Sequence, residues 1–249
     1  MNVSPIPIKG FPSVSRGELL YFLSWHGSSD KRIRDAVDFV ERNYEGRLRA
    51  SGNPATTEHL YPVTLSYVRY MWELADTDKS TAIMRGTKID RSVDGVVAAI
   101  LHDTIEDILT FTRTELAERF GEDVHYRVTN VTNVDIYEPD DALRRKKINA
   151  DLVSRIRALD FSDPRDWAVL VLKLADIENA VQTLPLPHDP GKEERIIRKM
   201  GEGRLQMAYD HSTHFYTAIS GELKRLGYDA VVDRVGHKRD FQLPVKQAV

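Results

Sequence analysis

Residues 96–107 read VVAAILHDTIED, so six apolar residues lead directly into a segment that holds one histidine and three acidic residues. On one continuous helix, His102, Asp103, Glu106 and Asp107 would fall within an arc of roughly 140°, because each residue turns the helix by about 100°. The apolar run predicts a helix that enters the core rather than lying on the surface. We therefore expect four ligands or proton-transfer groups to face one side of this helix.

The composition limits what such a cluster can bind. The 249 residues include 35 Lys plus Arg, 38 Asp plus Glu, and no cysteine. Without cysteine the chain has no disulfide framework, thiolate nucleophile, zinc finger or iron–sulfur cluster, so any metal must be bound by His, Asp or Glu. The net charge of −3 gives no support to nucleic-acid binding, which relies on basic surfaces.

Apolar residues recur at spacings of three and four along almost the whole chain, which predicts an all-α fold. Two expected helices have clear N-terminal signals, a capping box of Thr112 with Glu115 and an N-cap Asp163 followed by Pro164. The expected helices span residues 16–25, 31–48, 58–75, 92–108, 113–120, 123–131, 141–159, 165–184 and, with interruptions, 192–226.

We expect one domain over residues 1–249, with a core at about residues 31–209 and helical extensions at both ends. The polar stretch of residues 77–91 is predicted to be a long surface loop. The N-terminus lacks the basic and apolar regions of a signal peptide, and no apolar run approaches the roughly 20 residues that cross a bilayer. These features predict a cytoplasmic protein without membrane contact.

Two further residues stand where packing alone does not require them. Asp176 lies in a helix that is apolar nearly all round, where a carboxylate is costly unless it is paired or binds a metal. An ion pair with Lys173, three residues earlier, is the structural alternative. His59 follows a turn at an expected helix start, and taken alone it fits an ordinary histidine of the first helical turn.

Together, His59, His102, Asp103 and Asp176 form a set of two imidazoles and two carboxylates. Nitrogen and oxygen ligands of this kind suit a divalent ion such as Mn²⁺, Fe²⁺ or Zn²⁺ that keeps positions open for water and a phosphate oxygen.

In this order, the motifs resemble the HD-superfamily hydrolase domain of the RelA/SpoT alarmone enzymes, especially the small alarmone hydrolases. The resemblance covers about residues 31–209 and rests on five segments. The first segment is RASGNP at 49–54 with His59, which resembles R-K-S-G-E-P…H, and the second is AILHDTIED at 99–107, which resembles A-x-L-H-D-x-x-E-D. The third is FGEDV at 120–124 with VTN at 131–133, which resembles F-G-x-x-V…V-T-K. The last two are LKLAD at 172–176, which resembles K-L-A-D, and Thr183-Leu184, which resembles a closing T-L.

The resemblance implies an all-α HD-type helical bundle and a Mn²⁺-dependent enzyme that removes the 3′-pyrophosphate from (p)ppGpp, the alarmone of the stringent response. It implies His59, His102, Asp103 and Asp176 as metal ligands and the pair Glu106 and Asp107 as the groups that orient and deprotonate the attacking water. It also implies Arg49, Ser51 and Thr183 as nucleotide-binding residues.

This sequence departs from the family pattern at the nucleotide pocket. Alanine stands at 50, 55 and 180, where the family has lysine, tyrosine and a substrate-contacting asparagine. Asn179 and Gln182 replace a histidine and an arginine, and one residue is inserted before His59.

The hypothesis is therefore a metal-dependent phosphohydrolase of (p)ppGpp or a close nucleotide relative. Its expected partner is this small-molecule nucleotide, and whether the chain forms a homo-oligomer is left open. The first alternative is a phosphatase of another nucleotide, such as a deoxynucleoside triphosphate or NADPH. The second is a non-catalytic nucleotide sensor that keeps the HD fold, and retention of both Glu106 and Asp107 argues against it.

Overall fold

The computed structural model of the chain describes residues 13–25, 30–49, 52–76, 92–160, 163–183, 205, 213–225, 227, 229 and 232–233. The chain divides into two compact units: Met1–Val134 with Ser154–Leu184, and Asp135–Val153 with Pro185–Val249. This division does not test the expectation of a single domain, which stays a prediction. All the candidate site residues belong to the first unit.

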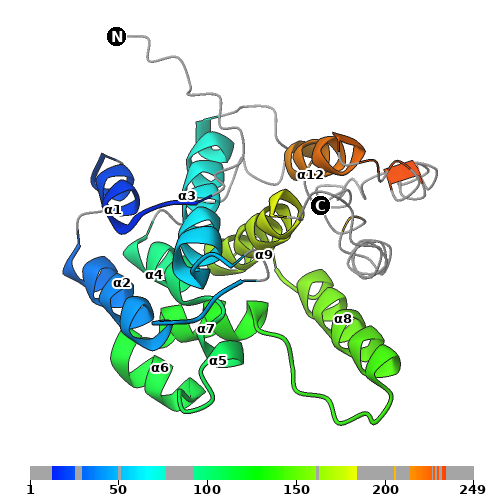
Figure 1. Ribbon diagram of the computed structural model, residues 1–249, viewed down its shortest axis with the longest axis horizontal. Helices are drawn as coiled ribbons and strands as arrows, with labels where there is room; N and C mark the ends of the chain where they lie inside the picture. The colour runs from blue at the N-terminus through cyan, green and yellow to red at the C-terminus, as the bar shows by residue number, and fades with distance from the viewer. Residues whose placement is uncertain are drawn as a thin grey trace, which may run out of the picture. The chain divides into compact units, whose positions relative to one another are not determined.

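The described residues fold into helices and contain no β-strand, so the predicted all-α fold is confirmed (Figure 1). The π-helical turn η1 lies between α2 and α3. The helices are α1 (Arg16–Trp25), α2 (Lys31–Asn43), α3 (Tyr61–Asp76), α4 (Val93–Leu101), α5 (Thr104–Asp107), α6 (Arg113–Phe120), α7 (Glu122–Val131), α8 (Asp141–Arg157), α9 (Pro164–Gln182) and α12 (Thr213–Arg225), with η1 at Thr56–Leu60.

Helix α9 is the central element of the first unit. It is buried along most of its length and packs against α3 and α7, and α3 runs beside it in Figure 1. Helix α4, whose residues from Gly95 to Leu101 are all buried, packs against α2, α3 and α7. The apolar run of the opening motif therefore lies in the core, as the sequence predicts.

Helix ends that depend on local chemistry match the sequence prediction. Thr112 and Glu115 form the expected capping box at the start of α6. Asp163 accepts a hydrogen bond from the backbone N–H of Arg165 at the start of α9, with Pro164 in the first turn. Helix α6 ends at Gly121, whose φ of 95° favours glycine.

The expectation of one helix over 92–108 is wrong, because the chain leaves the helix at His102 and Asp103. The hydroxyl of Thr104 donates to the carbonyl of Leu101 at 2.6 Å and satisfies a carbonyl at the end of α4. Asp103 has φ −96° and ψ −2°, in the bridge region of backbone space. The single turn α5 then carries Glu106 and Asp107.

Two other boundaries differ from expectation. Helix α2 ends at Asn43 rather than at residue 48, because Gly46 takes a φ of 73° and the chain turns away. The turn that follows is closed by the backbone hydrogen bonds from Arg49 to Asn53 and from Ala55 to Arg47. His59 then lies in η1 rather than in a regular first helical turn.

The expected loop at residues 77–91 and most of the expected helical stretch at 192–226 lie outside the described residues. In the part of the chain that is described, no helix is long and apolar enough to cross a membrane.

Candidate metal centre

Side chains from three helical segments meet at one point in the first unit. His59 of η1, His102 at the end of α4 and Asp176 of α9 each offer a ligand atom, and these atoms lie within 4.8 Å of one another. Asp103 joins them, because its Oδ2 is 2.9 Å from His59 Nε2 and its Oδ1 is 3.4 Å from His102 Nε2. The four residues that the sequence singles out as ligands are thus close together.

The hydrogen bonds behind the two imidazoles decide which nitrogen of each ring faces the centre. His102 Nδ1 is 2.9 Å from the carbonyl oxygen of Ala99, which can only accept, so Nδ1 carries the proton. His59 Nδ1 is 2.7 Å from Oδ1 of Asn179, which likewise can only accept. Each ring therefore presents an unprotonated Nε2 when it is neutral, and these two atoms are 3.2 Å apart.

Two nitrogen lone pairs and two carboxylates directed at one point repel each other unless a cation or a proton lies between them. The donor set of imidazole nitrogen and carboxylate oxygen fits a divalent transition ion. The residues present therefore fit a divalent metal.

The pKa shifts around Asp103 follow from the same geometry. Burial raises the pKa of Asp103, but the imidazoles of His102 and His59 outweigh it and leave this pKa well below its usual range. Burial lowers the pKa of His59, while the carboxylates of Asp103 and Asp176 raise it, and the net shift is upward. The two carboxylates thus favour the protonated, positively charged form of His59 when no metal is bound.

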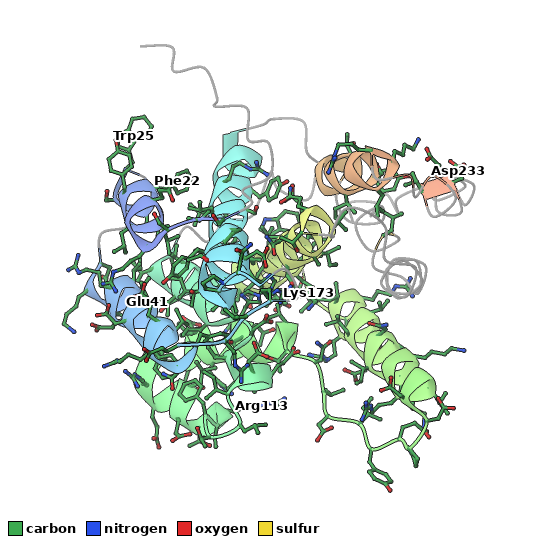
Figure 2. The ribbon with its side chains drawn as sticks, viewed as in Figure 1. Phe22, Trp25, Glu41, Arg113, Lys173 and Asp233 are labelled. Carbon is green, nitrogen blue, oxygen red and sulfur yellow. The ribbon has the colours of Figure 1, made fainter. Side chains whose placement is uncertain are left out.

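Asp176 satisfies both interpretations that the sequence leaves open. Its Oδ2 accepts a hydrogen bond from Nζ of Lys173 at 2.8 Å, which is the predicted ion pair. Its Oδ1 lies 3.6 Å from His59 Nε2, on the side of the centre. Lys173, labelled in Figure 2, is itself buried and also donates to the carbonyl of Val131.

Glu106 and Asp107 lie next to the centre on α5, and different partners bind them. The carboxylate of Glu106 accepts hydrogen bonds from the backbone N–H of Asn133 at 2.5 Å and from its side-chain amide at 2.8 Å and 3.0 Å. Oδ2 of Asp107 accepts from the hydroxyl of Tyr44 at 3.1 Å, and Oδ1 is paired with Arg47 at 3.1 Å.

Tyr44 connects this pair to the metal ligands. Burial raises the pKa of its phenol, and the negative charges of Asp103 and then Asp107 raise it further, so the hydroxyl stays protonated and donates to Asp107. Side-chain exposure rises from 4% at His59 to 21% at Asp103 and 39% at Asp107. The centre therefore opens to solvent on the side of α5.

Of the three predicted nucleotide-binding residues, the structure describes Arg49 and Thr183. Arg49 is half-buried, and its positive charge acts to lower the pKa of His59. Thr183 caps the end of α9, about two turns beyond Asp176, and its hydroxyl donates to the carbonyl of Asn179 at 2.9 Å. Ser51 lies outside the described residues.

Several residues of the site were not predicted as such. Arg47, Tyr44 and Asn133 bind the acidic pair, and Asn179 binds His59. The one available signal was the accumulation of acidic residues at a helix end, which requires a nearby cation, and Arg47 supplies it by donating also to the carbonyl of Asp107. Asn133 and Asn179 entered only through the family resemblance, as the end of the VTN segment and as a departure from the pattern, and nothing in the sequence pointed to Tyr44.

The amino-acid sequence is similar to those of several known proteins. A GTP pyrophosphokinase of Myxococcus xanthus is 29% identical over 166 residues, which cover 67% of this chain and 18% of that protein. A guanosine-3′,5′-bis(diphosphate) 3′-pyrophosphohydrolase of Haemophilus influenzae is 28% identical over 188 residues, or 76% of this chain and 23% of that protein. The resemblance to RelA/SpoT-type proteins is confirmed. The chain spans about a fifth of the length of these relatives, and no family model matches it.

A solved structure of a metazoan SpoT ortholog, described as hydrolysing ppGpp, shares the fold with a TM-score of 0.54. The match covers 80% of this chain and 97% of that chain, at 14% sequence identity. The predicted HD-type fold is therefore confirmed.

Proposed function

We propose that this chain is a metal-dependent hydrolase that removes the 3′-pyrophosphate from (p)ppGpp or a close nucleotide relative. The observation that carries the proposal is the convergence of His59, His102, Asp103 and Asp176, with the acidic turn of α5 beside them. The names of the sequence relatives support this nucleotide as the substrate. The proposed metal is Mn²⁺, held by these four residues.

The acidic turn suits the proton transfer that hydrolysis requires. A bound divalent ion supplies a lowered water pKa and neutralises phosphate charge. Glu106 is the more exposed carboxylate of the turn and receives the proton of the attacking water in this proposal. Asp107, held by Tyr44 and Arg47, orients the water, and the guanidinium of Arg49 binds phosphate oxygens.

The balance of atoms is that of a hydrolysis. The water oxygen forms a bond to the nearer phosphorus of the 3′-pyrophosphate, and the bond from that phosphorus to the 3′-oxygen breaks. The proton passes from water to Glu106, and the 3′-oxygen leaves with one proton from solvent. The products are pyrophosphate and a nucleotide with a free 3′-hydroxyl.

A phosphatase of another nucleotide is the second candidate, and the pocket residues favour considering it. Ala55 is buried at the start of η1, and Ala180 is half-buried on α9, where the resemblance expects tyrosine and a substrate-contacting asparagine. The substrate-contacting asparagine of the family pattern is therefore shortened to a methyl group at 180, and the tyrosine ring is absent at 55.

The deciding experiment incubates the purified protein and Mn²⁺ with ppGpp, pppGpp, a deoxynucleoside triphosphate and NADPH, and identifies the inorganic product of each. Release of pyrophosphate from ppGpp supports the main proposal. Turnover of a different nucleotide alone would replace the substrate and keep the chemistry. Nucleotide binding without turnover under every divalent metal would favour the sensor instead.

A further inference from the structure

Asn179 lies directly behind one of the metal ligands and is only 1% exposed. It follows Asp176 by three residues on α9, so the two side chains share one face of the helix. Its Oδ1 is 2.7 Å from Nδ1 of His59, and its Nδ2 is 3.3 Å from the carbonyl oxygen of Glu58. Both ends of this buried amide therefore bind η1, the segment that carries His59.

The two contacts together fix the direction of the amide. The carbonyl of Glu58 can only accept a hydrogen bond, so the NH₂ group of Asn179 must face it. The amide oxygen then faces His59, and because it can only accept, His59 must carry its proton on Nδ1. His59 Nε2, which carries a lone pair when the ring is neutral, consequently faces His102 and Asp103.

We infer that Asn179 is a positioning residue that holds His59 in the tautomer and ring orientation that metal binding requires. The inference rests on the proposed function, because the metal centre is part of it. The departure of Asn179 from the family pattern had assigned it to the altered nucleotide pocket. The inference assigns it instead to the residues that support the metal ligands.

The chemistry of asparagine suits this position because the site requires an acceptor for His59 and a donor for Glu58. Leucine has a similar shape and offers neither. Aspartate keeps the acceptor, loses the donor and adds a negative charge behind His59, so Asn179→Asp separates the contact with His59 from the contact with the backbone. Partners that stand behind a metal-binding histidine commonly contribute 10- to 100-fold in metal affinity.

The test measures Mn²⁺ affinity of the whole chain by calorimetric titration. Asn179→Leu is expected to weaken Mn²⁺ binding by about 10- to 100-fold, and Asn179→Asp to stay close to the unmodified protein. The matched control is Asn130→Leu on α7, because the Asn130 amide donates to the Tyr126 carbonyl at 2.9 Å and to none of the metal ligands. Its Mn²⁺ affinity is expected to be unchanged.

A second readout follows the proton on His59 by nitrogen-15 NMR of the protein loaded with diamagnetic Zn²⁺. The hydrogen-bonded Nδ1–H of His59 should be protected from exchange with water in the unmodified protein and in Asn179→Asp. In Asn179→Leu it should exchange rapidly. A general loss of structure would instead lower the unfolding temperature of the metal-free protein and change many signals.

The outcomes separate the inference from the proposed function. If the unmodified protein binds Mn²⁺ and Asn179→Leu binds it equally well, the positioning role is wrong while the metal centre stands. Weak binding by Asn179→Asp, as poor as that of Asn179→Leu, would also contradict it. If the unmodified protein binds no divalent metal, both the centre and the positioning role fail.

Discussion

Asp103 interacts electrostatically with both histidines of the centre and with Tyr44. Its two carboxylate oxygens face His59 and His102, and Tyr44 lies close enough for the charge of Asp103 to raise the pKa of its phenol. The same carboxylate holds the pKa of His59 up against the effect of burial. Removing it would leave two neutral imidazoles and Asp176, whose other oxygen is engaged by Lys173.

Asp103→Ala is therefore expected to abolish stoichiometric metal binding. Glu106→Gln should keep the metal, because Glu106 is bound by Asn133 and not by the ligands, and should lose turnover by roughly 10²-fold or more. Metal content and hydrolysis rate are measured on the same preparations. An Asp103→Ala protein that retains one metal ion, or a Glu106→Gln protein that loses it, would show that these roles are wrongly assigned.

At this scale, sequence reasoning selected residues whose chemical types are uncommon in a core, such as a histidine and carboxylates beside apolar runs. It did not select Tyr44, and it placed Asn179 at the nucleotide pocket rather than behind a metal ligand. The importance of both comes from partners that lie far away in the sequence, 120 residues for Asn179 and His59 and 63 residues for Tyr44 and Asp107.

Among the elements, the irregular ones carry the ligands. His59 stands in the π-helical turn η1, and His102 and Asp103 occupy the turn between α4 and α5. A π-helical turn accommodates one more residue than an α-helical turn, which agrees with the residue inserted before His59. The regular helices and caps were predictable from local signals, whereas these irregular turns depend on packing between helices.

The close approach of α3 to α4 gives a test of this packing. A Cβ at Gly95 of α4 would collide with the buried hydroxyl end of Tyr67 on α3. In an open helix, Gly→Ala would stabilise by about 0.5–1 kcal/mol, but here Gly95→Ala should destabilise the protein by about 1–3 kcal/mol through overpacking.

Denaturant unfolding of Gly95→Ala, Tyr67→Phe and the double variant measures this effect as a coupling energy. The double variant should recover part of the loss, because phenylalanine removes the atom that the new methyl group meets first. A Gly95→Ala protein as stable as the unmodified one would mean that α3 and α4 are less tightly packed there.

For the whole molecule, the metal is expected to join segments that are distant in the sequence. The ligands come from η1 before α3, from the end of α4 and from α9, and these helices form the core of the first unit. The amino-acid composition predicted only that such a metal site must be formed by His, Asp or Glu. The net charge of −3 says little about polyphosphate binding, because Asp103 and Asp176 belong to a site that a cation neutralises.

The stabilisation of the fold by bound metal should increase with pH. In the metal-free protein the pKa of His59 is raised, so its protonation stabilises the fold below the unfolded-state value of about 6.5. This contribution is lost as pH rises through the folded-state pKa. Metal binding requires unprotonated Nε2, so protons compete with the ion at low pH.

The increase in unfolding temperature caused by saturating Mn²⁺ should therefore grow from about pH 6 to about pH 8. Thermal unfolding with and without Mn²⁺ across this range measures it. Asp103→Ala, which lacks the ligand, should show no such increase at any pH. A metal effect that is constant with pH, or larger in acid, would mean that His59 does not exchange its proton for the metal, because a histidine ligand must lose that proton before Nε2 can bind.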